Sequence, residues 1–76
     1  TSVEAIPNPF ADRLTLAGLA EANRVSVLTP TGKVMLTVSL NGQWQVELQL
    51  GHLPAGLYLV VVQAAGEQRV MRVVKE

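Results

Sequence analysis

The sequence predicts an all-β domain of about seven short antiparallel strands, and three observations lead to this prediction. Apolar residues alternate with polar residues along most of the chain, as expected for strands that bury one face. Gly, Pro or Asn bounds each alternating segment, and these residues favour turns. Turn signals recur roughly every eight to twelve residues, a spacing that is typical of β-sandwiches.

The order of the elements follows from this alternation and from the turn residues between the alternating segments. We expect strands at Val3–Ile6, Arg13–Leu16, Arg24–Thr29, Val34–Leu40, Gln43–Leu50, Leu57–Ala64 and Glu67–Val74. The stretch Gly18–Asn23 contains good helix formers, but it is too short to sustain a helix. It is therefore predicted to be a loop with room for one helical turn.

Two hairpins are expected from their turn residues. Asn41-Gly42 separates two alternating segments, and Asn-Gly is the strongest two-residue hairpin signal because a type I′ turn needs positive φ at both positions. A second hairpin is expected at Ala65-Gly66. In the segment that follows Asn41-Gly42, the alternation predicts a core-facing row consisting of Trp44, Val46, Leu48 and Leu50.

Seven such strands in 76 residues predict a single domain over residues 1–76 with an immunoglobulin-like antiparallel β-sandwich fold. An open barrel is the alternative. Half of the residues are apolar, at 49%, so a domain of this size can be held by its core. The first residue is Thr rather than Met, and we expect the chain to be part of a larger precursor.

Composition excludes several classes of function. Six basic and six acidic residues give a net charge of zero, which provides no electrostatic footprint for nucleic acid or for an acidic membrane surface. Without cysteine the chain can form no disulfide, thiolate zinc site or iron–sulfur cluster. The longest apolar run, 56–62, is far shorter than the ~20 residues of a membrane-spanning helix. No membrane insertion is expected.

No catalytic, cofactor-binding or metal-binding residue is expected either. His52 is the single histidine, and it lies in a turn without a nucleophile motif around it. One histidine and no Asp-rich loop cannot supply the ligands of zinc or calcium. Among the aromatic residues, Trp44 and Tyr58 lie in phase with the apolar faces of their strands. Core packing is therefore the favoured interpretation for both.

Three motifs carry more information than the composition. The segment formed by Pro7, Asn8, Pro9 and Phe10 is a rigid corner, because each proline fixes φ. A glycine turn at Gly32-Lys33 joins two strands. The segment that contains Leu53, Pro54, Gly56 and Tyr58 is typical of a tyrosine corner, in which the ring is buried and the hydroxyl binds nearby backbone.

In this order, and followed by a basic last strand with Arg69, Arg72 and Lys75, the motifs resemble the C-terminal sorting domain of the type IX secretion system of Bacteroidetes. The Pro-Asn-Pro-Phe segment, the Gly-Lys turn and the Leu-Pro-Ala-Gly-Leu-Tyr segment match that family over nearly the whole chain. Two positions depart from it. Thr29, followed by Pro30, stands where the family usually has Asp, and Val61 replaces a polar or basic residue.

The resemblance implies a non-catalytic secretion signal attached to an N-terminal cargo protein. The implied partners are an outer-membrane shuttle protein, the translocon and a sortase that removes the domain. The implied location is the periplasm during transit, then the outer-membrane surface or the extracellular space. The residues predicted to be recognised are Pro7, Asn8, Pro9, Phe10, Gly32, Lys33, Arg72 and Lys75. For each of them a purely structural role is the competing interpretation.

Two other functions stay open on the sequence alone. A fibronectin-type or immunoglobulin-like adhesion module would give similar strands but usually needs about 100 residues. A carbohydrate-binding module would need Trp44 to be exposed. Leu57, Leu59 and Val61 lie on the strand face opposite Tyr58. This second apolar face leaves three possible covers: the loop at residues 18–23, a second copy in a dimer, or the shuttle protein.

Overall fold

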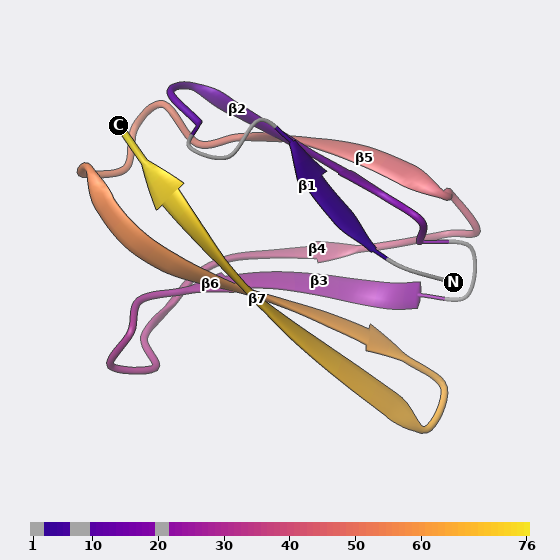
Figure 1. The fold of residues 1–76 in the computed structure, drawn as a ribbon. Coiled ribbons are helices and arrows are strands. Elements are labelled where there is room, and N and C mark those ends of the chain that lie inside the picture. The colour runs from indigo at the N-terminus through magenta and orange to yellow at the C-terminus, as the bar shows by residue number, and fades with distance from the viewer. Residues whose placement is uncertain (1–2, 7–9, 20–21) are drawn as a thin grey trace.

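In a computed structural model of the chain, the described residues, 3–6, 10–19 and 22–76, form an all-β sandwich (Figure 1). They contain seven strands: β1 (Glu4–Ile6), β2 (Arg13–Ala17), β3 (Ala22–Leu28), β4 (Val34–Ser39), β5 (Gln45–Gln49), β6 (Gly56–Ala64) and β7 (Glu67–Lys75). The predicted fold class is confirmed, and most strand bounds lie within two residues of those expected.

The strands form two antiparallel sheets. One has three strands in the order β1-β2-β5, and the other has four in the order β4-β3-β6-β7. β3 and β6 occupy the centre of the four-stranded sheet, and β4 and β7 are its edges. Because the described strands divide into two separate sheets, the open barrel is not the observed arrangement.

The core lies between the two sheets and takes alternate residues from both. Leu14 and Leu16 of β2 and Leu48 of β5 are buried against Val25, Val60 and Val73 of the four-stranded sheet. The loop between β2 and β3 also contributes, because Leu19 is 1% exposed and joins the same cluster. Residues 20 and 21 of this loop lie outside the described residues.

One predicted hairpin forms and the other does not. β6 and β7 pair along their whole length across the turn at Ala65-Gly66. The prediction of a hairpin at Asn41-Gly42 is wrong, because β4 pairs with β3, and β5 pairs with β2 in the other sheet. Gly42 has a φ of 89°, but no described non-glycine residue has positive φ. Asn41 therefore does not adopt the type I′ geometry, and the chain crosses between sheets.

The predicted burial of Trp44 is also wrong. The alternation holds for Val46, Leu48 and Leu50, which pack in or against the core. The β2–β5 ladder ends at the pair Ala17↔Gln45, so Trp44 lies beyond the sheet and is 60% exposed. Its carbonyl accepts a hydrogen bond from the backbone N–H of Leu19 at 2.8 Å.

Candidate functional site

Phe10 and the last strand meet at one end of the sandwich. The backbone N–H of Phe10 donates to the carbonyl of Val74 at 2.9 Å, and the N–H of Glu76 donates to the carbonyl of Phe10 at 2.8 Å. Together they make a parallel bridge between Phe10 and Lys75. We call these bonds the Phe10 clamp. Pro7, Asn8 and Pro9 of the same motif lie outside the described residues.

The segment that follows Phe10 also joins the two sheets. The Phe10 side chain is completely buried in the core, while its backbone binds β7. Two residues later, the carbonyl of Asp12 accepts a bond from the N–H of Leu50 at 2.7 Å, directly after β5. A Cβ added at Gly51 would lie 3.1 Å from the Asp12 carboxylate oxygen. The segment from Phe10 to Asp12 therefore connects the end of the three-stranded sheet to the end of the four-stranded sheet.

The two basic residues predicted at the C-terminus have different environments. Arg72 is exposed, whereas Lys75 is only 8% exposed. Lys75 of β7 pairs with Gly56 of β6. Its Nζ donates a hydrogen bond to the main-chain oxygen of Glu76 at 3.3 Å. Lys75 is buried because odd-numbered residues near the end of β7 face the core, as the burial of Val73 also shows.

The turn between β3 and β4 is held by Thr29. The N–H of Gly32 donates to the Thr29 carbonyl at 2.9 Å, and Gly32 has a φ of 96°, a conformation that favours glycine. The N–H of Lys33 donates to Oγ1 of Thr29 at 3.1 Å. The hydroxyl of Thr29 thus accepts a turn hydrogen bond, a function that an Asp carboxylate could also perform. Lys33 itself is exposed.

Tyr58 has the geometry of a tyrosine corner. Its side chain is 5% exposed, and its hydroxyl donates to the carbonyl of Pro54 at 2.6 Å. Leu53 is buried, and β6 begins at Gly56. The hydroxyl bond fixes the loop 50–55 over the end of the core, next to the Phe10 clamp.

Strand register brings these elements to the same end of the four-stranded sheet. Leu28, at the end of β3, pairs with Leu59 near the start of β6. Gly56 pairs with Lys75 at the end of β7. The start of β6 and the end of β7 accordingly lie at the upper left in Figure 1, and the β3–β4 turn lies at the lower left, at the same end of the sheet but at its opposite edge. We call this the C-terminal end of the sandwich.

The remaining candidate features are metal ligands, the single histidine and membrane-spanning helices. No three His, Cys, Asp or Glu side chains among them are grouped as metal ligands would be. His52 is exposed in the turn after Gly51. Within the same described ranges, no helix has the length and apolar character needed to cross a membrane.

Sequence reasoning missed two parts of this site. The pairing of Phe10 with the end of β7 joins segments from opposite ends of the chain, and no local pattern announces it. The bond between Asp12 and Leu50 is a backbone contact, so side-chain identity does not encode it. The available signal was the aromatic residue Phe10 at the end of the proline motif, which is buried in the core.

Comparison with known families gives one match. Residues 4–76 match the family model described as the secretion system C-terminal sorting domain. A search of curated proteins finds no match to the chain. The matched range includes every strand described above and both halves of the Phe10 clamp.

Proposed function

Since the chain belongs to the family of type IX secretion C-terminal sorting domains, we propose that it acts as a non-catalytic signal whose folded C-terminal end is recognised by the secretion machinery. The family indicates a sorting signal carried as the C-terminal tail of a cargo protein. It also implies secretion across the outer membrane toward the cell surface or the extracellular space.

The Phe10 clamp is the observation that supports recognition of a folded end. It holds residues 74–76 in a defined backbone conformation at the end of the four-stranded sheet where β6 begins. Arg72 and Lys33 are exposed at or near this end, whereas the side chains of Phe10 and Lys75 are buried. We propose that Arg72, Lys33 and Gly32 present contacts, and that Phe10 and Lys75 shape the end that carries them.

A reporter fusion tests the sorting function. Residues 1–76 are fused behind a secreted reporter and expressed in a type IX-competent bacterium and in a strain that lacks the translocon. Surface or extracellular reporter in the competent strain alone is the expected result. Equal export in both strains, or in neither, would contradict the sorting function.

We further propose that a sortase of the system removes the domain after translocation. The same fusion tests this step, because the exported reporter should have lost the mass of the 8.2 kDa domain. An exported reporter that keeps the domain in a sortase-positive strain would disprove removal and leave the sorting function intact.

One observation favours a second candidate, carbohydrate binding. Trp44 is 60% exposed, and an exposed aromatic ring can stack on a sugar. Because it is the single tryptophan of the chain, its fluorescence reports binding directly. Titration with soluble cellulose and chitin oligosaccharides should leave the emission unchanged if sorting is the function. A saturable change that Trp44→Ala abolishes would favour the carbohydrate module.

A further inference from the structure

The outer face of the four-stranded sheet carries a contiguous apolar surface. Cross-strand pairs place Leu57 beside Val74 and Val61 beside Val70, and they place Leu28 beside both Leu59 and Val34. We call these seven residues the outer patch. Four of them are well exposed: Val34 and Val70 at 55%, Val74 at 44% and Leu57 at 41%.

An apolar outer face is unusual for an antiparallel sheet with one side in water. Such sheets normally alternate apolar and polar residues, and strands that are apolar on both faces are typical of sheets covered on both sides. β6 is apolar on both faces from Leu57 to Val62. Within the part of the β2–β3 loop that the structure describes, Leu19 packs in the core and does not provide the cover. A contiguous exposed apolar patch of this kind marks an interaction site.

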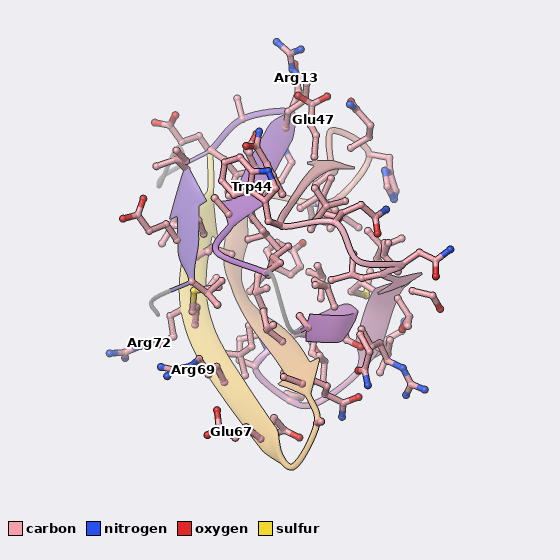
Figure 2. All side chains as sticks on the ribbon, turned by 90° about the vertical axis from the view of Figure 1, so that its right-hand side faces the viewer. Arg13, Trp44, Glu47, Glu67, Arg69 and Arg72 are labelled. Carbon is pink, nitrogen blue, oxygen red and sulfur yellow. The ribbon has the colours of Figure 1, made fainter. Side chains whose placement is uncertain are left out.

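The charges around the outer patch limit what can bind there. Arg24 and Arg72 lie on the same outer face, and Lys33 lies in the adjoining turn. Among the strand residues of β3, β4, β6 and β7 that lie on this face, none is Asp or Glu, and the nearest carboxylate along the chain is that of Glu76, directly after β7. Figure 2 shows Arg72 and Arg69 projecting from β7, away from Arg13 and Glu47 of the three-stranded sheet. A second copy packed face to face would bring like charges together.

The outer patch is also unlike a surface built for lipid. Proteins that lie on membranes usually insert aromatic side chains at the interface. Here Phe10 and Tyr58 are buried in the core and Trp44 lies next to β5. The outer patch instead consists of Val and Leu on a sheet, a surface that suits close packing against another protein.

The outer patch continues into the C-terminal end of the sandwich. Leu57 and Val74 lie in the pair next to Gly56↔Lys75. At the opposite end of the same face the residues are polar, with Arg24 beside Gln63 and Gln63 beside Gln68. The apolar part of the face therefore adjoins the Phe10 clamp.

We propose that the outer patch docks onto an apolar surface bordered by carboxylates on a protein of the type IX machinery. This inference rests on the proposed sorting function and specifies the face that is used. Burial of Val70 and Val34 provides the apolar contact. Arg72, Arg24 and Lys33 pair with acidic residues at the rim of the partner surface.

Charge substitutions in the reporter fusion test the docking face. Val70→Glu and Val34→Glu place a carboxylate in the outer patch at two opposite edges. Ile6→Glu is the matched control, because Ile6 is also a strand residue, is 53% exposed and lies on the other sheet. We expect the two patch variants to lower exported reporter about tenfold, which corresponds to ~1.4 kcal/mol of binding, and the control to export normally.

The folded state of each variant is checked on the purified domain by circular dichroism and urea denaturation. Exposed strand positions should tolerate the change, and Val70→Thr, which keeps the β-branched shape, provides a second patch variant should Val70→Glu unfold. If the wild-type fusion is not exported by the competent strain, the sorting function itself is refuted. Normal wild-type export together with normal export of folded patch variants would overturn the outer-patch inference alone.

Crosslinking identifies the occupant. A benzophenone amino acid at position 70 should give an adduct with a type IX machinery protein, and the same group at position 6 should not. Three results would overturn the proposal: an adduct with a second copy of the domain, a dimer in sedimentation equilibrium that Val70→Glu dissociates, or binding to phosphatidylglycerol vesicles that Val70→Glu abolishes.

Discussion

The backbone N–H of Phe10 lies 2.9 Å from the carbonyl of Val74 and donates a hydrogen bond to it. This bond and the bond from the N–H of Glu76 to the Phe10 carbonyl attach the end of β7 to the backbone of Phe10. The ring is buried in the core, so the position of residues 74–76 depends on core packing. The proposed recognition of the C-terminal end would consequently be coupled to the stability of the fold, and experiments must separate the two.

Phe10→Ala should strongly destabilise the domain. Truncation of a buried Phe leaves a cavity and costs about 3–5 kcal/mol, a large part of the stability of a small domain. Urea denaturation of the purified domain measures it. The control is Trp44→Ala, which removes a larger but exposed side chain and should change stability by only ~0.5 kcal/mol. Similar losses for the two variants would contradict the burial of Phe10.

Deletion of residues 74–76 should lower stability as well as export. It removes both bonds of the Phe10 clamp and the pairs Leu57↔Val74 and Gly56↔Lys75, at about 1 kcal/mol for each hydrogen bond. Lys75→Met keeps the backbone and should stay within about 1 kcal/mol of wild type, because replacing a buried charge by an apolar side chain is often neutral. A deletion variant as stable as wild type would show that the clamp contributes nothing.

Arg72→Gln should reduce export without unfolding the domain. Arg72 is exposed, and loss of one surface charge changes stability by at most about 1 kcal/mol. Arg13→Gln on the three-stranded sheet is the matched control and should export normally. Quantitative blotting of surface reporter distinguishes them. Equal export of both variants would remove Arg72 from the recognition surface.

Thr29→Val should destabilise the β3–β4 turn by about 1 kcal/mol, because the N–H of Lys33 loses its side-chain acceptor. Thr29→Asp should keep the stability of the wild-type domain, since a carboxylate accepts the same hydrogen bond. Thermal unfolding followed by circular dichroism ranks the three proteins. If the Val and Asp variants melt together, the Thr29 hydroxyl does not hold the turn.

Tyr58→Phe should cost about 0.5–1.5 kcal/mol, the usual contribution of a buried hydrogen bond. The ring remains in the core, so the loss isolates the 2.6 Å bond to the carbonyl of Pro54. The shift of the urea midpoint at constant m-value measures it. A midpoint equal to that of wild type would mean that solvent compensates the Pro54 carbonyl fully.

Local sequence predicted those features of the fold that local physics controls. The β6–β7 hairpin follows from two alternating segments and a glycine turn, and the buried rows of β2 and β5 follow from period-two alternation. The Asn41-Gly42 hairpin failed because β4 finds a better partner in β3, and pairing between distant strands overrides the turn preference. The predicted burial of Trp44 was wrong because the alternation of apolar and polar residues does not show where a sheet ends.

The candidate site could be predicted only in part. The motifs singled out Phe10 and the last strand separately, but the contact between Phe10 and Val74 joins segments from opposite ends of the chain, and only the assembled sandwich creates it. Burial of Lys75 depends on the phase of β7 relative to the core, which the basic pattern of that strand obscures. The outer patch was visible as a second apolar face on β6, and its exposure required the arrangement of the other sheet.

The Phe10 clamp also has a consequence for the time at which the domain folds. Contacts between distant segments form late because loop closure must precede them, and this clamp needs residues 74–76. A chain that has not yet emerged to this point cannot close the sandwich at this end. A receptor that binds the closed end would therefore distinguish chains that include residues 74–76 from chains that stop before them, so the signal would report closure of the domain as well as identity.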